Sequence, residues 1–358
     1  MSKFHPLTIA DVRHETRDTI AVTFTVPAEL RDSFRFQQGQ HLTLRAHIDN
    51  DDVRRSYSIC SAVQDNTLRV AIKRTSGGLF SGWANDTLRP GHTLDVMPPM
   101  GHFNVPLNPE HRKHYLAFAA GSGITPILSI IKTTLAAEPH SRFTLVYGNR
   151  ASSSVIFRDE LSDLKDSYLE RLKITYVMSR EQQDIELFNG RITQEKTAQF
   201  LQHWINASDI DTAFICGPED MMLGVSTALQ QAGMPKADIK IELFAASIPK
   251  HQHQPRAAAS DTHRQTEVTV IMDGNAASFS MEQDKESLLD AGLRAGLDMR
   301  YSCKGGVCST CRCKVIEGKV DMDVNYALED YEIARGYVLS CQSFPTTDRV
   351  VIDFDQAE

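Results

Sequence analysis

Hydrophobic and polar positions alternate over short runs in the first hundred residues of this chain. Residues 21–26, 39–44 and 68–73 alternate or are rich in β-branched side chains, and turn-forming residues separate them. The region ends in the breaker sequence Pro98-Pro99-Met100-Gly101. Several short strands at this spacing predict a small antiparallel β-barrel over residues 1–106.

Longer apolar runs follow, and they alternate with helical stretches between residues 107 and 247. The sequence predicts one helix containing residues 127–131 and four buried strands, at residues 114–119, 143–147, 172–177 and 212–215. This β-α-β-α order predicts an α/β domain with a doubly wound parallel sheet.

A polar stretch over residues 248–265 contains almost no large apolar side chain and predicts a linker. Its histidines, His251, His253 and His263, could bind a metal, but a solvated tether is the interpretation we prefer.

The last segment, residues 266–358, again predicts a compact domain. Strands are predicted at 268–272, 276–281 and 350–354. Between them a helix is predicted, with Asp284 as its cap, inward-facing leucines and a stop at Gly296. The inward leucines are Leu288, Leu289 and Leu293.

Four cysteines within this segment have a specific spacing. Cys303, Cys308, Cys311 and Cys341 form the pattern C-x4-C-x2-C-x29-C, which is the plant-type spacing for a [2Fe–2S] cluster. A zinc site usually uses two C-x2-C pairs, and disulfides would require an oxidising compartment. We therefore predict a cluster with these four ligands. Cys313 is expected to be a packed strand residue.

Composition and charge narrow the functional classes. The hydrophobic content of 41% and charged content of 23% are ordinary for a globular protein, and no apolar run is long enough to cross a membrane. The N-terminus has no apolar signal core, so we expect a cytoplasmic protein. Residues 267–358 carry 17 acidic and 9 basic side chains and hold the whole net charge of −8. This acidity argues against a nucleic-acid partner. It fits either a partner protein with a basic patch or a solubility role.

A glycine-rich turn follows the first predicted parallel strand. In Gly121-Ser122-Gly123-Ile124-Thr125-Pro126 the glycines allow backbone N–H groups to approach a pyrophosphate at a helix N-terminus. The placement between strand and helix favours a dinucleotide site over a simple tight turn.

Two further candidates lie at the ends of later strands. No acid closes the second parallel strand; Arg150 stands there instead, and an arginine can pair with a 2′-phosphate, which favours NADPH while leaving NADH possible. Arg158 is a possible second contact. Cys216-Gly217-Pro218 ends the fourth strand at its ligand-binding edge, although for this motif alone a buried cysteine before a helix is the better interpretation.

In the predicted barrel, Arg55-Ser56-Tyr57-Ser58 places a cation and a flat ring two residues apart on one face of a strand. An arginine can bind a flavin phosphate while a tyrosine stacks on the ring. Gly78 and Ser81 could add donors to the same pyrophosphate.

Taken in order, these motifs resemble the ferredoxin–NADP reductase superfamily fused to a C-terminal plant-type ferredoxin. The flavin motif R-x-Y-S/T matches Arg55, Tyr57 and Ser58, and the motif G-x-x-S matches Gly78 and Ser81. The remaining matches are the nucleotide motif G-x-G-x-x-P at Gly121, Gly123 and Pro126 and the C-G-P motif at Cys216, Gly217 and Pro218. The order of the domains is most similar to the reductase subunits of phenylacetyl-CoA epoxidases and of steroid hydroxylases.

The resemblance implies an FAD β-barrel, a nucleotide-binding α/β domain and a β-grasp [2Fe–2S] domain. It implies that Tyr57 lies against the flavin ring, with Phe244 as the C-terminal aromatic beside it. It also places Ser58 and Cys216 near the reacting flavin N5 and nicotinamide C4, as catalytic residues. The other cofactor-binding positions that it implies are Ser56, Lys73, Ser122 and Thr125.

The chemistry implied is electron transfer from NADPH, through FAD and the cluster, to a separate oxygenase, as in aerobic phenylacetate degradation. A hydride carries two electrons and the cluster accepts one, so a flavin must stand between them. The open alternatives are the reductase of another oxygenase, an electron donor to a hybrid-cluster protein or a desaturase, and a redox-sensing module with an inert reductase part.

Overall fold

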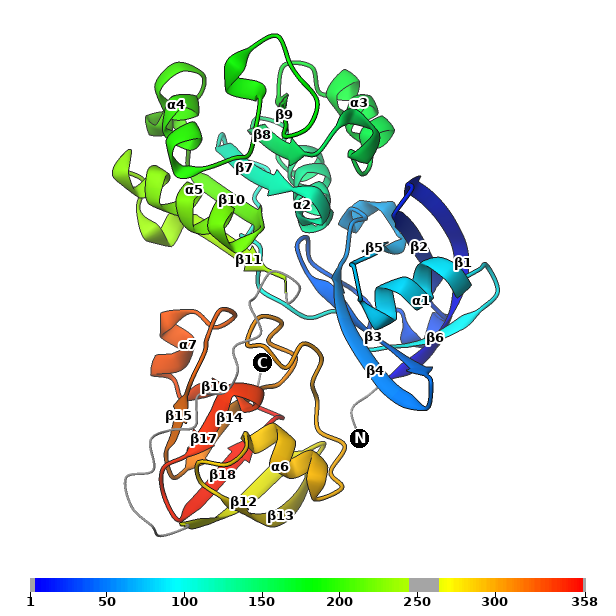
Figure 1. Ribbon diagram of the computed structural model, residues 1–358, viewed down its shortest axis with the longest axis vertical. Helices are drawn as coiled ribbons and strands as arrows, with labels where there is room; N and C mark the ends of the chain where they lie inside the picture. The colour runs from blue at the N-terminus through cyan, green and yellow to red at the C-terminus, as the bar shows by residue number, and fades with distance from the viewer. Residues whose placement is uncertain (1–3, 245–263, 357–358) are drawn as a thin grey trace. The chain divides into compact units, whose positions relative to one another are not determined.

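The computed structural model describes residues 4–244 and 264–356. Most of the predicted linker, including His251, His253 and His263, lies outside the described residues. The chain divides into two compact units, His5–Val53 with Tyr57–Ser247, and Ile248–Glu358 with Met1–Phe4 and Arg54–Ser56. Each is described by itself (Figure 1).

The first part of the larger unit is a six-stranded antiparallel sheet in the order β4-β3-β6-β1-β2-β5. The strands are β1 (His5–Thr16), β2 (Thr19–Thr25), β3 (His41–Ile48), β4 (Asp51–Ser58), β5 (Leu68–Lys73) and β6 (Thr93–Val96). An antiparallel bridge between Ile59 and Val70 joins the two outer strands, so the sheet closes into the predicted barrel. Helix α1 (Leu79–Thr87) follows β5 and places Phe80 and Ala84 in the barrel core.

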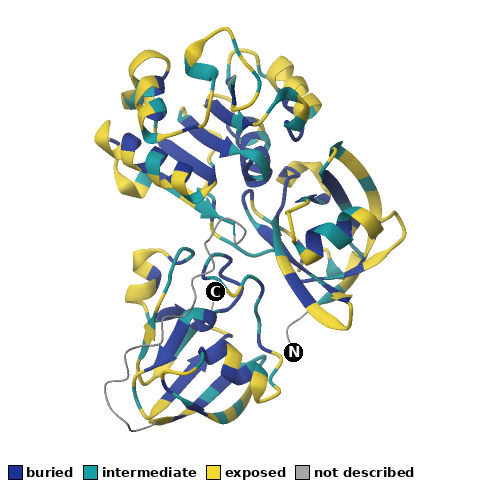
Figure 2. Cartoon of the chain, in the orientation of Figure 1, coloured by how far each residue is buried: buried dark blue, intermediate teal, exposed yellow. Residues whose placement is uncertain are grey.

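The second part of the larger unit is a five-stranded parallel sheet in the order β11-β10-β7-β8-β9. The strands are β7 (His114–Ala120), β8 (Arg142–Asn149), β9 (Leu172–Met178), β10 (Thr212–Gly217) and β11 (Ile239–Leu243). The four predicted strands are present, and β11 is an addition. Figure 2 shows these strands buried along most of their length.

Helices cover both faces of the parallel sheet. They are α2 (Ile124–Ala137), α3 (Arg158–Ser167), α4 (Gln194–His203) and α5 (Glu219–Gln231). Successive residues of β7 point to opposite faces, so Tyr115 and Ala117 join a core with α2 and α3 while Leu116 and Phe118 join one with α4 and α5. The sheet is therefore doubly wound, as predicted.

The smaller unit contains a five-stranded sheet in the order β13-β12-β18-β14-β16 and a two-stranded sheet of β15 and β17. Its elements are β12 (Gln265–Met272), β13 (Asn275–Glu282), α6 (Leu288–Arg294), β14 (Arg312–Glu317), β15 (Val320–Met322), α7 (Asp330–Ala334), β16 (Tyr337–Leu339), β17 (Ser343–Pro345) and β18 (Arg349–Asp353). β12 and β18 pair in parallel, and the other pairs of the larger sheet are antiparallel.

One predicted helix cap is wrong. The N-cap of α6 is Ser287, whose hydroxyl accepts a hydrogen bond from the Asp290 backbone N–H, and not Asp284. A serine hydroxyl one residue before the helix reaches that N–H, whereas Asp284 lies a further turn away along the chain. Gly296 ends the helix with φ +83°, as predicted.

Within residues 4–244 and 264–356, none of the helices is long and apolar enough to cross a membrane.

Candidate functional site

The glycine-rich turn lies at the carboxyl end of β7, where a doubly wound sheet binds its ligands. Residues Gly121–Gly123 form one short 3-10 turn, and α2 begins at Ile124. Gly121 has φ +54°, in the left-handed region that favours glycine. A Cβ on Gly123 would lie 2.1 Å from the carbonyl oxygen of Cys216. Only glycine fits at position 123 without a clash. Such close backbone packing is typical of a turn whose N–H groups bind a phosphate.

The side chains of Thr125 and Pro126 are buried in the first turn of α2. The Thr125 hydroxyl donates a 3.0 Å hydrogen bond to the carbonyl of Ser122, so it stabilises the turn from inside. Pro126 occupies a position whose N–H has no partner within a helix.

One polar contact of the site joins the barrel to the parallel sheet. Ser58, the last residue of β4, donates a 3.1 Å hydrogen bond to a carboxyl oxygen of Glu242 on β11. Glu242 lies opposite Cys216 in the pairing of β11 with β10. The structure thus brings together the two predicted catalytic residues, Ser58 and Cys216, around an acid that sequence reasoning missed.

Burial sets the protonation of this cluster. It raises the pKa of the Glu242 carboxyl to about 8, and the hydrogen bond from Ser58 opposes that rise. Burial, helped by the nearby Glu242 side chain, also raises the pKa of the Cys216 thiol well above its ordinary value. At neutral pH both groups therefore hold a proton. Phe244, which is half-buried two residues after Glu242, packs against the same hydrophobic core.

The predicted flavin residues lie on β4 and around α1. Arg55 is exposed, and Ser56 and Tyr57 are half-buried on the same strand. The Tyr57 ring contacts Phe80 of α1 with ring centroids 5.7 Å apart, which leaves part of the ring at the surface. An exposed guanidinium beside a partly exposed ring is a donor set that suits a flavin nucleotide.

Gly78 and Ser81 shape the turn before α1. Gly78 is the N-cap of α1, and the Ser81 hydroxyl accepts from the Thr75 N–H at 3.1 Å and donates to the Gly78 carbonyl at 3.3 Å. Lys73 ends β5, and its ammonium group lies 3.6 Å from the Cβ position of Gly121. A lysine thus lies next to the turn that is predicted to bind a phosphate.

Arg150 follows β8 and is exposed. Its carbonyl accepts a 2.8 Å hydrogen bond from the backbone of Arg180, just after β9. Arg180 lines an open pocket of about 330 Å³ together with Met178, Ser179, Glu181, Gln182, Asn189 and Gly190. Two arginines thus lie at neighbouring strand ends on the ligand-binding edge. Arg180 was missed from sequence, although its place directly after a strand was a usable signal.

In the smaller unit, the four predicted cluster cysteines lie as two pairs. The side chain of Cys303 interacts with that of Cys308, and the side chain of Cys311 with that of Cys341. The backbone N–H groups of Cys303 and Gly305 donate to cysteine sulfurs at 3.4 and 3.3 Å. Across residues 4–244 and 264–356 no group of three or more His, Cys, Asp or Glu side chains gathers as at a single metal ion. Paired thiols with N–H donors to sulfur are the donor set of a two-iron cluster.

Cys313 is fully buried in β14, opposite Val338 of β16. It is therefore a packed strand residue, as predicted.

Comparison with protein families identifies all three regions. Residues 6–105 match the oxidoreductase FAD-binding domain, residues 118–227 the oxidoreductase NAD-binding domain and residues 270–346 the 2Fe-2S iron-sulfur cluster binding domain. The chain is 48% identical to one of the subunits of 1,2-phenylacetyl-CoA epoxidase from Escherichia coli (strain K12), over 99% of both chains. It belongs to the ferredoxin–NADP reductase-type proteins that carry a C-terminal [2Fe–2S] domain and serve oxygenases as reductase components.

Other members show how widely the family is used. The chain is 38% identical to the ferredoxin reductase component of 3-ketosteroid-9-alpha-monooxygenase from Rhodococcus rhodochrous, over 97% of this chain and 96% of the relative. Among solved structures, phthalate dioxygenase reductase shares the fold, with a TM-score of 0.57, 23% identity and 98% of both chains covered. The protein is therefore a flavin and iron–sulfur oxidoreductase that uses FAD, a nicotinamide nucleotide and a [2Fe–2S] cluster.

Proposed function

We propose that this chain is the reductase subunit of a phenylacetyl-CoA epoxidase, and that it works in the cytoplasm, where its thiols stay reduced. The observation that carries the proposal is 48% identity, over 99% of both chains, to a component of the Escherichia coli epoxidase. The similarity extends over the whole length of both chains, and the surface of a reductase decides which oxygenase accepts its electrons.

FAD would be held by the barrel. Arg55 and Gly78 would bind its pyrophosphate, with Ser56, Lys73 and Ser81 as further polar contacts. Tyr57 and Phe244 would lie against the ring system. When bound, FAD accepts two electrons together and releases them one at a time.

The nicotinamide nucleotide would bind along the carboxyl edge of the parallel sheet. Backbone N–H groups of the turn from Gly121 to Gly123 would bind the pyrophosphate, with Ser122, Thr125, Pro126, Gly217 and Pro218 shaping the site. Arg150 and Arg180 would bind a 2′-phosphate, which favours NADPH over NADH. Two arginines at neighbouring strand ends, joined by a backbone hydrogen bond, support this preference.

Ser58, Glu242 and Cys216 would form the reacting end of the site. The Glu242 carboxyl can exchange a proton with the Ser58 hydroxyl across their 3.1 Å contact. The Cys216 thiol keeps its proton because its pKa is raised, so it provides a neutral, apolar wall beside the nicotinamide. Cys303, Cys308, Cys311 and Cys341 would hold the [2Fe–2S] cluster, which takes single electrons to the oxygenase.

A coupled turnover assay tests the proposal. Purified reductase, the oxygenase subunits from the same cells, phenylacetyl-CoA and NADPH should together consume phenylacetyl-CoA and form its epoxide. Reductase alone should reduce ferricyanide and leave phenylacetyl-CoA unchanged. An oxygenase that turns over no faster with this reductase than without it would contradict the assignment.

The second candidate is the reductase component of a steroid monooxygenase. It is favoured by the 38% identity to the Rhodococcus rhodochrous component. The same assay with a 3-ketosteroid and its monooxygenase distinguishes the two, because electron delivery should be efficient with only one of the oxygenases.

A further inference from the structure

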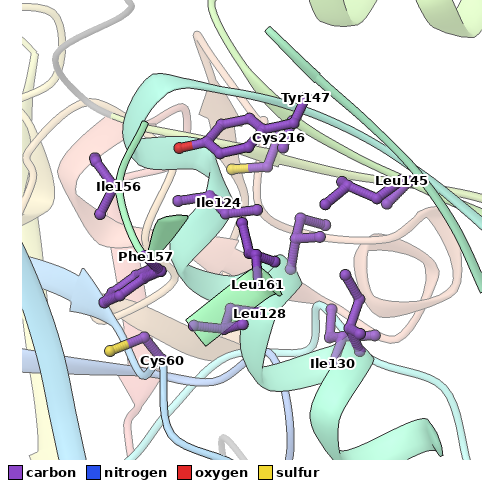
Figure 3. Close-up of a cluster of buried hydrophobic side chains, with 14 of the residues drawn as sticks. Cys60, Ile124, Leu128, Ile130, Leu145, Tyr147, Ile156, Phe157, Leu161 and Cys216 are labelled. Atoms are coloured by element: carbon purple, nitrogen blue, oxygen red, sulfur yellow. The ribbon is translucent and has the colours of Figure 1, made fainter. Parts of the chain in front are cut away.

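Tyr147 on β8 is fully buried, and its hydroxyl donates a 2.9 Å hydrogen bond to the backbone carbonyl of Gly121. The two residues are 26 positions apart, so the contact depends on the pairing of β7 with β8. Figure 3 shows the Tyr147 ring within the core cluster that also contains Ile124 and Cys216. A buried hydroxyl thus lies beneath the first residue of the phosphate-binding turn.

The direction of the Gly121 carbonyl determines what the turn offers to a ligand. In a planar trans peptide the C=O and the next N–H point in opposite directions. Holding the Gly121 carbonyl toward Tyr147, in the core, therefore directs the Ser122 N–H away from the core. A carbonyl oxygen facing a pyrophosphate would repel it, whereas an N–H attracts it.

The Gly121 carbonyl accepts the Ile124 backbone N–H at the start of α2, and the Tyr147 hydroxyl is a second donor that holds it toward the core. With φ +54° and no side chain, the glycine has access to several backbone conformations. The other end of the turn is already fixed, since Gly123 lies directly against the backbone of Cys216. The contact with Tyr147 leaves the turn held at both ends.

The hydroxyl is also suited to act as a donor. In the 2.9 Å contact the hydroxyl proton is directed at the Gly121 carbonyl, and the phenol oxygen keeps its capacity to accept. In Figure 3 the hydroxyl oxygen is directed toward the side on which Ile156 lies. Burial raises the pKa of Tyr147 well above its ordinary value, so the proton is retained at every working pH.

We propose that Tyr147 is a positioning residue for the pyrophosphate of the nicotinamide nucleotide, acting through the Gly121 carbonyl. It touches neither the nucleotide nor the flavin. It fixes the orientation of the peptide whose N–H faces the pyrophosphate, so it strengthens binding of NADPH and NADH equally.

The test uses the full-length holoprotein with Tyr147→Phe, which removes one oxygen. Calorimetric titration with NADP⁺ and with NAD⁺ should show dissociation constants raised by about three- to tenfold for both, the effect of one lost hydrogen bond. KM for NADPH and NADH should rise by the same factor. The kcat for ferricyanide reduction and the flavin content should stay within twofold, and the ratio of NADPH to NADH affinity should not change.

Tyr115→Phe is the matched control. Tyr115 is equally buried on the adjacent strand β7, but its hydroxyl bonds Glu138 at 2.9 Å near the amino end of that strand. It should lose similar thermal stability and keep both dissociation constants within twofold. Unchanged nucleotide affinity in Tyr147→Phe, equal loss in the control, or a changed preference between the two nucleotides would overturn the inference. Loss of FAD from Tyr147→Phe would also overturn it, because the hydroxyl would then support the whole fold.

Discussion

Ser58 and Glu242, 184 residues apart, meet in a 3.1 Å hydrogen bond between the flavin-binding barrel and the nucleotide-binding sheet. This contact brings a half-buried acid beside both predicted catalytic residues. Because burial raises the pKa of Glu242 to about 8, the contact also makes stability depend on pH.

The first prediction concerns that dependence. Between the ordinary pKa of 4.5 and about 8, folded Glu242 holds a proton that the unfolded chain has released, so stability falls as pH rises through this range. Glu242→Gln stays neutral at every pH. We expect its thermal midpoint to equal that of the wild type near pH 5 and to exceed it by several degrees at pH 8.5, on the order of 2 kcal/mol.

The same variant should slow NADPH-dependent ferricyanide reduction by at least about tenfold, since an amide cannot exchange a proton with Ser58. Asp220→Asn, at an exposed position in α5, is the control and should change neither quantity. Melting curves of wild type and Glu242→Gln that run parallel from pH 5 to 9 would exclude the raised pKa.

The second prediction concerns nucleotide preference. Arg150→Ala should raise KM for NADPH by about tenfold or more and leave KM for NADH nearly unchanged, because a charge-assisted contact is worth about 1.5–3 kcal/mol. Arg180→Ala should act in the same direction. Arg142→Ala, at the opposite end of β8, should change neither KM. A wild-type protein that prefers NADH would show the assignment to be wrong.

The third prediction concerns the cluster. Replacing Cys303, Cys308, Cys311 or Cys341 singly by Ser should reduce bound iron and the visible absorption of the cluster, because the two irons require four thiolates. Cys313→Ser is the internal control and should keep its iron, at some cost in stability for a buried hydroxyl. Iron loss from Cys313→Ser together with an intact cluster in one of the other four variants would require a new ligand set.

The fourth prediction concerns the ion network between the barrel and the parallel-sheet domain. Glu160 accepts hydrogen bonds from Arg69 at 2.7 and 2.9 Å and from Lys132 at 2.7 Å, all with partly buried side chains. Glu160→Ala should therefore lower the free energy of unfolding by about 1–3 kcal/mol.

Asp86→Ala provides the comparison for Glu160→Ala. Asp86 pairs with Arg74 at an exposed position, and its loss should lower the free energy of unfolding far less than the loss of Glu160. Chemical denaturation of the two variants measures the difference, and equal costs would show that the Glu160 network does not hold the two domains together.

The strands that were predicted correctly are those with a clear alternation of apolar and polar residues along a short run. The run Leu68–Lys73 was predicted with the bounds that β5 has, because alternation is a property of neighbouring residues. Strand β11 was missed because Ile239–Leu243 is short and carries Lys240 and Glu242, although these alternate with apolar residues as an edge strand would. The cap of α6 was predicted wrongly as Asp284. The better signal was Ser287 followed three residues later by Asp290, since this is the spacing of a capping residue and an acid in the first turn.

The candidate site also has parts that local sequence motifs predict and parts that they do not. Its motifs around Arg55, Gly121 and Cys303 are contiguous, so a single sequence is enough to identify them. The role of Glu242 depends on a contact with Ser58 across 184 residues, and that of Tyr147 on the pairing of two strands. The spacing of residues in the sequence does not predict such contacts, because they form only when the sheet forms.

The central strand of the iron–sulfur domain, β18, is also its last strand along the chain. During synthesis, β12 and β14 therefore leave the ribosome before the strand that lies between them exists. The cysteine loop is likewise made before its scaffold can close, and contacts between distant segments form slowly. The sheet of this domain can therefore be completed only after β18 has left the ribosome, and we expect the cluster to be inserted after that step.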